Sequence, residues 1–140
     1  TLFRSVVPQR GDGLDERIAA AFEDTAGTGP CLLIGMDTPQ LAADPSPLAP
    51  ALAPDAWREC DAWFGPAVDG GFWALGLARP EPALVRGVPM STASTGAAQR
   101  ARLTGAGLRV RDLPRLLDVD AADDAARVAV LAPHGRFAAQ

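Results

Sequence analysis

Three short motifs place aspartates beside expected strands, where a carboxylate could do chemistry. The first motif, residues 35–39, puts Asp37 just after the apolar run at residues 31–34. A carboxylate there is a hard oxygen ligand suited to Mg²⁺ or Mn²⁺ bridging a substrate phosphate, and ligands of open α/β sheets bind beyond the carboxyl ends of strands. An Asx turn, or a helix cap with Pro39 at the first helical position, explains the same residues. Spacing alone leaves both interpretations of Asp37 open.

The second motif, residues 65–71, contains Asp69 followed by Gly70 and Gly71. Two glycines let a backbone approach a ligand closely, and Asp69 could bind a sugar hydroxyl or a metal ion. An Asp-Gly turn between two strands accounts for the same residues without any ligand. The sequence favours neither interpretation over the other.

The third motif contains Asp118 and Asp120, at an expected strand end and helix start. Successive strand side chains point to opposite faces, so at most one of the two carboxylates is expected to face a shared cleft. A helix N-cap role for Asp120 is the alternative to metal ligation. Ser91 and Thr92 are likewise predicted to cap a helix, with substrate contact as the alternative.

Other kinds of site lack the residues they need. His134 is the only histidine and lies in a C-terminal segment with Pro and Gly, so a His-based zinc site or a Ser-His-Asp triad has no support. All 13 basic residues are Arg, so no Lys can complete a Walker phosphate-binding motif. Trp73 is predicted to pack in the core rather than stack on a base.

The composition is that of one globular domain. The chain has 140 residues, of which 48% are hydrophobic and 21% charged, and no apolar run approaches the ~18 residues of a membrane span. A net charge of −4 argues against general nucleic-acid binding. Cys31 and Cys60 belong to no Cys-x-x-Cys pair, and the first ten residues have no signal-peptide pattern. We therefore expect a cytoplasmic protein.

The order of the expected elements predicts an α/β fold. Apolar spacing predicts a helix from Leu14 to Phe22, and the short apolar run at 31–34 is typical of a strand buried on both faces, as in a parallel sheet. Further along the chain we expect helical character at 55–61, strands at 62–65 and 71–77, a helix from about 92 to 105, a strand at 108–111 and a last helix from Asp120. Alternating strands and helices predict a three-layer α/β/α sandwich with a mostly parallel sheet, to which the strands at 62–65 and 71–77 could add an antiparallel element.

The three motifs, in this order, resemble the domain of unknown function 2064 family. The resemblance runs from Val6 to about Ala129, and it is strongest at residues 35–41, 65–77, 87–92 and 118–120. It implies a glycosyltransferase-A fold similar to nucleotide-diphosphosugar transferases, with guanylyltransferases among the relatives. Members begin with a strand and a basic, Gly-containing loop that would hold nucleotide phosphates. We expect residues 1–5 to be a non-native lead, because the first residue is not Met and Val6-Val7 already has the character of a strand, and we expect 133–140 to be a tail. By the resemblance, residues 6–132 are a domain that lacks its N-terminal strand or strands.

The resemblance also implies what each motif does. Asp37 would be the principal metal ligand, Asp120 would stand near a second metal ligand, and Asp69 would act on the sugar or acceptor side. Substrate contacts are expected from the residues of the motifs that lie beside these carboxylates: Gly35, Thr38, Pro66, Gly70, Gly71, Ser91 and Thr92.

The function predicted from these residues is transfer from a nucleotide-activated donor, assisted by Mg²⁺ or Mn²⁺. The donor is expected to be a nucleotide sugar, with a small molecule as acceptor. Nucleotidyl transfer from a nucleoside triphosphate, with release of pyrophosphate, is the first alternative, because the two reactions share a fold and a metal chemistry. A non-catalytic binding module, or an inactive fragment, is the alternative from a different class.

Overall fold

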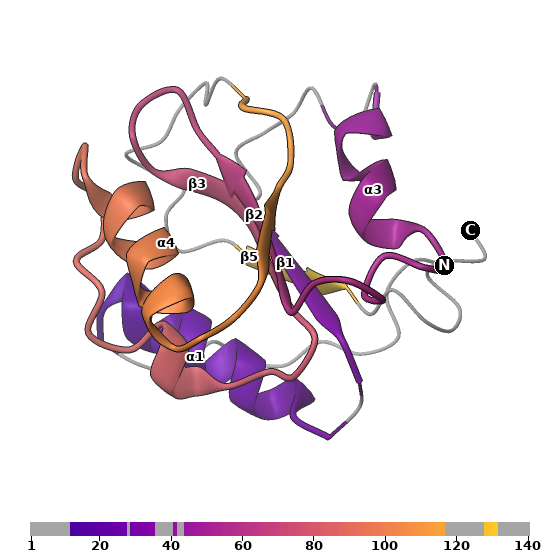
Figure 1. The fold of residues 1–140 in the computed structure, drawn as a ribbon. Coiled ribbons are helices and arrows are strands. Elements are labelled where there is room, and N and C mark those ends of the chain that lie inside the picture. The colour runs from indigo at the N-terminus through magenta and orange to yellow at the C-terminus, as the bar shows by residue number, and fades with distance from the viewer. Residues whose placement is uncertain (1–11, 28, 36–40, 42–43, 117–127, 132–140) are drawn as a thin grey trace.

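The computed structural model describes residues 12–27, 29–35, 41, 44–116 and 128–131 (Figure 1). In chain order the elements are α1 (Leu14–Thr25), β1 (Cys31–Gly35), the 3₁₀ turn η1 (Ser46–Leu48), α3 (Ala49–Leu52), β2 (Ala62–Pro66), β3 (Phe72–Leu77), the 3₁₀ turn η2 (Pro82–Leu84), α4 (Thr95–Gly105), β4 (Val110–Asp112) and β5 (Val128–Leu131). No helix in these ranges is long and apolar enough to cross a membrane.

Within the described residues the five strands form one mixed sheet in the order β4-β2-β3-β1-β5. The pairs β1–β3, β2–β3 and β1–β5 are antiparallel, and β2–β4 is parallel. Because β1 and β2 both run opposite to β3, they run in the same direction as each other and as β4. The predicted α/β fold class is confirmed, but the prediction of a mostly parallel sheet is wrong for this part of the chain.

The apolar run of β1 led to the prediction of a parallel sheet, but it reflects only that both faces of the sheet are covered. Cys31 and Leu33 pack with Ile18 and Phe22 of α1 on one face, while Leu32 packs with Leu48 and Ala51 of η1 and α3 on the other. In Figure 1, α1 and α4 lie on one side of the sheet and α3 on the opposite side. Burial on both faces requires cover on both sides, and it sets no direction for the neighbouring strands.

A β-bulge interrupts the β2–β3 ladder close to the turn that joins these strands. Gly65 pairs with Ala74 and Pro66 with Phe72, so Trp73 is an extra residue in β3. A bulge turns two successive side chains toward the same face. Accordingly Trp73 and Ala74 both join the cluster under α3, whereas Phe72 lies on the α1 side, its ring 5.7 Å from that of Phe64.

Most of the locally predicted elements are confirmed, with two corrections. Residues 55–61 form turns rather than a helix, closed by the hydrogen bonds from Ala56 N–H to Ala53 O and from Arg58 N–H to Asp55 O. Ala56 O, which a helix would pair with Cys60 N–H, accepts instead from the Cys60 thiol and the Trp63 indole. Residues 128–131, expected within the last helix or after it, form β5 instead. The start of that helix at Asp120 lies outside the described residues.

The two cysteines form no disulfide with each other and lie in different clusters. Cys31 packs on the α1 side of the sheet and Cys60 on the α3 side, where its thiol donates to Ala56 O at 3.2 Å. Burial raises the pKa of the Cys60 thiol, so this side chain behaves as a small buried apolar group.

Candidate functional site

The carboxyl ends of β1, β2 and β4 meet at one edge of the sheet, because these three strands run in the same direction. Each of the three aspartate motifs follows one of these strands in the sequence. Asp37 comes two residues after Gly35, and Asp69 comes three residues after Pro66. Asp118 and Asp120 come shortly after the segment that extends β4. This is the edge at which ligands of α/β sheets bind.

Several of the predicted residues fall outside the part of the chain that the structure describes. Asp37, Thr38 and Asp120 are among them. The strand ends that precede these residues in the sequence are described. Gly35 pairs with Val128 at the start of β5, and one strand, β3, separates β1 from β2. Neighbouring strands lie ~4.8 Å apart, so the ends of β1 and β2 are about 10 Å from each other.

Asp69 sits in the tight turn between β2 and β3. Its Oδ1 accepts a hydrogen bond from Gly71 N–H at 2.9 Å, and Gly70 N–H donates to Ala67 O at 3.1 Å. The side chain is exposed, and within the described residues its Oδ2 makes no hydrogen bond or ion pair. The turn interpretation of this motif is confirmed, and it uses only one of the two carboxylate oxygens.

The glycines of this turn approach protein backbone. Gly70 O accepts from Gly96 N–H of α4 at 2.8 Å, and a Cβ placed on Gly70 would stand 2.0 Å from Ala93 O. A Cβ on Gly96 would likewise lie 2.7 Å from Gly71 O. The close approach expected toward a ligand therefore serves to dock the turn against the start of α4.

Ser91 and Thr92 lie just before α4, and the capping prediction is confirmed for Thr92 only. The residue at the N-cap position is Ser94, whose side chain makes no capping bond. Thr92 supplies the cap from two residues earlier, because its Oγ1 accepts from Ser94 N–H at 3.2 Å and its own N–H donates to Thr95 Oγ1 at 3.1 Å. The buried Thr95 hydroxyl donates to Pro89 O at 2.8 Å. Ser91 has a φ of +61°, an uncommon conformation for a residue other than glycine.

Pro66 joins the second motif to the segment that leads to the third. Its carbonyl accepts from Leu116 N–H at 3.1 Å, and Val68 N–H donates to Leu116 O at 2.9 Å. In Figure 1 the β2–β3 turn and the extension of β4 lie side by side. The structure thus brings together Pro66, Asp69, Gly70, Gly71 and the segment before α4, with Gly35 farther along the same edge.

The carboxylates at this edge are not equivalent. Asp112, at the end of β4, pairs with Arg100. Arg100 Nε and Nη2 donate to the two carboxylate oxygens of Asp112 at 3.1 and 3.0 Å. This pairing raises the pKa of Arg100. No group of three His, Cys, Asp or Glu side chains in the described ranges could hold a metal ion. A metal site at this edge would therefore need Asp37 or Asp120 beside Asp69.

Sequence reasoning missed two contributors to this edge, Trp73 and Gly96. Trp73 Nε1 donates to Pro114 O at 2.9 Å, between residues 41 positions apart in the chain. The visible signals were the prolines at 66 and 114, which remove backbone donors where a strand pair is expected to continue. For Gly96 the sequence holds no local signal, because its close contact is with a turn far away in the chain.

Comparison with known proteins gives one family and one solved structure. Residues 3–92 match the family described as "Uncharacterized protein conserved in bacteria (DUF2064)". The crystal structure of a proposed nucleotide-diphospho-sugar transferase from Desulfovibrio desulfuricans G20 is similar to this chain, with a TM-score of 0.61 at 30% identity. The similarity covers 80% of this chain and 48% of that one, so the chain spans about half the length of the solved relative. No curated protein matches the chain.

Proposed function

The chain belongs to the bacterial DUF2064 family, and on that premise we propose that it is part of a metal-dependent transferase that uses a nucleotide-activated donor. The name of the similar crystal structure favours a nucleotide sugar as the donor. An acceptor hydroxyl would attack the anomeric carbon of the sugar, the bond from that carbon to the diphosphate would break, and the nucleoside diphosphate would leave. A small molecule is the proposed acceptor.

The observation that supports this proposal most is the common direction of β1, β2 and β4. Their carboxyl ends share one edge, and an aspartate motif follows each of them. A donor diphosphate and an acceptor must meet in one place, and carboxylates that left the sheet at opposite edges could not serve both. The shared edge supports a single site built from motifs that are more than thirty residues apart in the sequence.

The carboxylates of the aspartate motifs are the kind of metal ligand that Mg²⁺ and Mn²⁺ prefer. These ions bind through one or two carboxylates together with substrate phosphates, and aspartates follow both β1 and β4 in the sequence. Asp37 and Asp120 are the ligands we propose. When bound, the ion would neutralise the negative charge that develops on the leaving diphosphate.

We propose that Asp69 acts on a sugar or acceptor hydroxyl. Its Oδ1 is held by Gly71 N–H, which fixes the side chain, and its Oδ2 is open to accept a second hydrogen bond. A hydroxyl that donates to this oxygen would be oriented for attack and could pass its proton to the carboxylate. Ser91 and Thr92, beside the same turn, are the proposed hydroxyl-bearing contacts to the substrate.

Calorimetric titration with Mn²⁺, followed by GDP or UDP, tests the proposal. We expect metal-dependent nucleotide binding that Asp37→Ala removes. The matched control is Asp55→Ala, an exposed aspartate in the turns that precede β2, which we expect to bind as the unaltered chain does. A folded chain that binds neither metal nor nucleotide, even when extended upstream, would contradict the transferase proposal.

Product analysis then separates the two transfer reactions. Release of a nucleoside diphosphate from a nucleotide sugar marks glycosyl transfer. Release of pyrophosphate from a nucleoside triphosphate marks nucleotidyl transfer, the alternative that shares this metal chemistry. Binding without either product would identify a binding module.

A further inference from the structure

The parallel pairing between β2 and the extension of β4 lacks one hydrogen-bond donor. Pro66 O accepts from Leu116 N–H, and in a parallel ladder a residue placed this way donates its own N–H to the carbonyl two positions earlier in the partner. That carbonyl belongs to Pro114, but Pro66 has no N–H to donate. The register also slips here, because three steps from Phe64 to Ala67 face four from Asp112 to Leu116. A backbone acceptor is left over at the edge where the motifs meet.

The indole of Trp73 supplies the missing donor. Its Nε1–H donates to Pro114 O at 2.9 Å, and its side chain is 1% exposed. The bulge at Trp73 turns this side chain to the face it shares with Ala74, and the absence of a side chain on Gly65 makes room for the ring. A Cβ on Gly65 would lie 2.6 Å from the ring carbon Cε2. Bulge, glycine and indole together fill the gap that the proline leaves.

We propose that Trp73 is a positioning residue that substitutes for the N–H of Pro66 and holds the segment from Leu113 to Leu116 in place beside the Asp69 turn. Its role in catalysis rests on the proposed function, because Asp118 and Asp120 follow this segment in the sequence. A small shift of this segment would move Leu116, from which the chain continues to these two aspartates, relative to Asp69. Groups that hydrogen-bond metal ligands directly typically contribute 10–100-fold to metal affinity or activity, and for Trp73, which acts through the backbone, we expect the lower end of that range.

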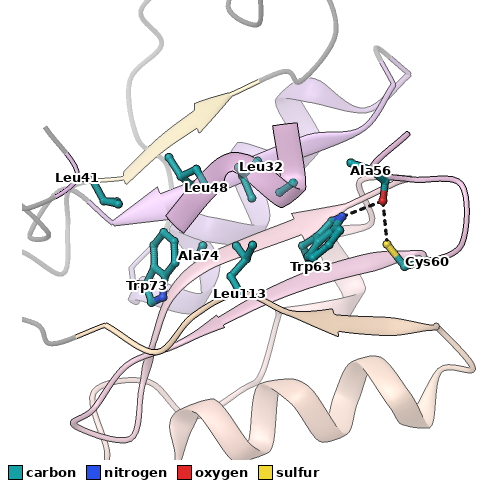
Figure 2. Packing of buried hydrophobic residues seen from close by; sticks show 10 residues of the cluster. Leu32, Leu41, Leu48, Ala56, Cys60, Trp63, Trp73, Ala74 and Leu113 are labelled. Atoms are coloured by element: carbon teal, nitrogen blue, oxygen red, sulfur yellow. Dashed lines mark hydrogen bonds between the residues drawn. The ribbon is translucent and has the colours of Figure 1, made fainter. Parts of the chain in front are cut away.

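The chain contains a matched control in Trp63. This residue is also buried in the cluster under α3, and its Nε1–H also donates to a backbone carbonyl, Ala56 O, at 3.1 Å. Figure 2 shows the two indoles toward opposite ends of the cluster. Trp73→Phe and Trp63→Phe therefore make the same chemical change in the same core, one near the proposed site and one away from it.

Amide hydrogen exchange tests the positioning role without any ligand. The N–H groups of Leu116 and Val68 report on the hydrogen bonds between β2 and the extension of β4, next to Trp73. The N–H groups of Asp61 and Ala62 both donate to Arg109 O and report on the other end of the same strand pair. We expect Trp73→Phe to accelerate exchange at the first pair of amides about tenfold more than at the second. Trp63→Phe should show no such preference. Equal acceleration at both ends in Trp73→Phe, or the same pattern in both variants, would overturn the proposal.

Metal titration then tests the link to function. In a chain that binds Mn²⁺ and nucleotide, Trp73→Phe should weaken Mn²⁺ binding about tenfold, whereas Trp63→Phe should stay within twofold of the unaltered chain. Equal affinities for the two variants would refute the catalytic part of the role. If the unaltered chain binds no metal, the proposed function fails, and hydrogen exchange alone decides whether Trp73 positions the segment.

Gly65→Ala keeps the question answerable if Trp73→Phe does not fold. The new methyl group would displace the indole while leaving its N–H intact, so the bond to Pro114 O should lengthen or break. We expect the same selective acceleration at Leu116 and Val68. Retained protection at these amides in a folded Gly65→Ala variant would count against the role of the indole.

Discussion

The two ends of the β2–β4 strand pair are held in opposite ways. At the end where β2 begins, Asp61 and Arg109 satisfy each other almost completely. Arg109 donates its backbone N–H and Nε to Asp61 Oδ2 and its Nη2 to Oδ1, and Arg109 O accepts from Asp61 N–H. At the end where β2 finishes, Asp69 Oδ1 accepts one hydrogen bond, and its Oδ2 has no partner among the residues that the structure describes. At the first end, which we call the closed end, the polar groups of Asp61 and Arg109 bond to each other. At the second, which we call the site end, a carboxylate oxygen of Asp69 is left exposed.

This difference shows that carboxylates which stabilise the fold and carboxylates available to a ligand can lie at opposite ends of one small sheet. A carboxylate that already accepts several hydrogen bonds has little left to offer a ligand. Besides the Arg100–Asp112 pair, the site end is held by close glycine contacts and one buried indole, and these leave an oxygen of Asp69 open. Functional groups on loops above a rigid sheet edge are a common arrangement in α/β proteins.

The largest effect on stability is expected from Gly70→Ala, which acts on the site end. Gly70 has a φ of +96°, and a Cβ there would stand 2.0 Å from Ala93 O. The matched control is Gly107→Ala, with a φ of +86° and no atom within 4 Å of the added Cβ. We expect the control to cost about 1 kcal/mol for its backbone conformation alone. Gly70→Ala should cost about 2 kcal/mol more, because the turn must move away from α4.

Chemical denaturation of the two glycine variants measures this difference in unfolding free energy. Equal losses would mean that the turn can move away from Ala93 at little cost, and the site end would then be less tightly packed than the closed end. A selective loss would show that glycine contacts hold the site end firmly.

A smaller effect is expected from Asp61→Asn at the closed end. Asn can still accept from Arg109 N–H but loses the charge, which at this partly exposed position contributes about 1 kcal/mol or less. Hydrogen bonding from Arg109 lowers the pKa of Asp61 below its ordinary value. Because the folded-state pKa is the lower one, the stabilisation is present above the unfolded value of about 3.9 and is lost as the pH falls through the folded value.

Thermal unfolding between pH 7 and pH 2.5 checks this sign. The unaltered chain should lose more stability on acidification than Asp61→Asn, and metal binding at neutral pH should be the same in both. A variant as sensitive to acid as the unaltered chain would show that Asp61 does not set the pH dependence.

Local chemistry explains why much of the fold could be predicted from the sequence. Helix α1 and the β2–β3 hairpin follow from apolar spacing and an Asp-Gly turn, both of which are properties of neighbouring residues. The direction of β1 could not be obtained this way, since covered faces look alike in parallel and antiparallel sheets. Strand β5 was missed because a four-residue apolar run fits a strand and a buried helix segment equally well.

The candidate site was predictable in its motifs and not in its contacts. Asp69, Gly70 and Gly71 were found from their types and spacing. What fixes them is non-local, because Gly70 docks on Gly96 and Trp73 reaches Pro114. Trp73 was correctly predicted to lie in the core, and its second role as a donor depends on a bulge that the sequence does not reveal.

The smallest effect on stability is expected from Asp69→Asn, which tests whether the open carboxylate oxygen distinguishes the site end from the closed end. Asn preserves an oxygen that can accept from Gly71 N–H, so the turn should remain and the unfolding free energy should change by less than about 0.5 kcal/mol. Asp44→Asn is a matched control, since Asp44 Oδ1 accepts from Ser46 N–H at 3.1 Å in a similar exposed turn. Transferase activity should fall about 10–100-fold in Asp69→Asn and stay unchanged in Asp44→Asn. If both variants retain full activity, Asp69 is only a turn residue, and the open oxygen at the site end has no part in the chemistry.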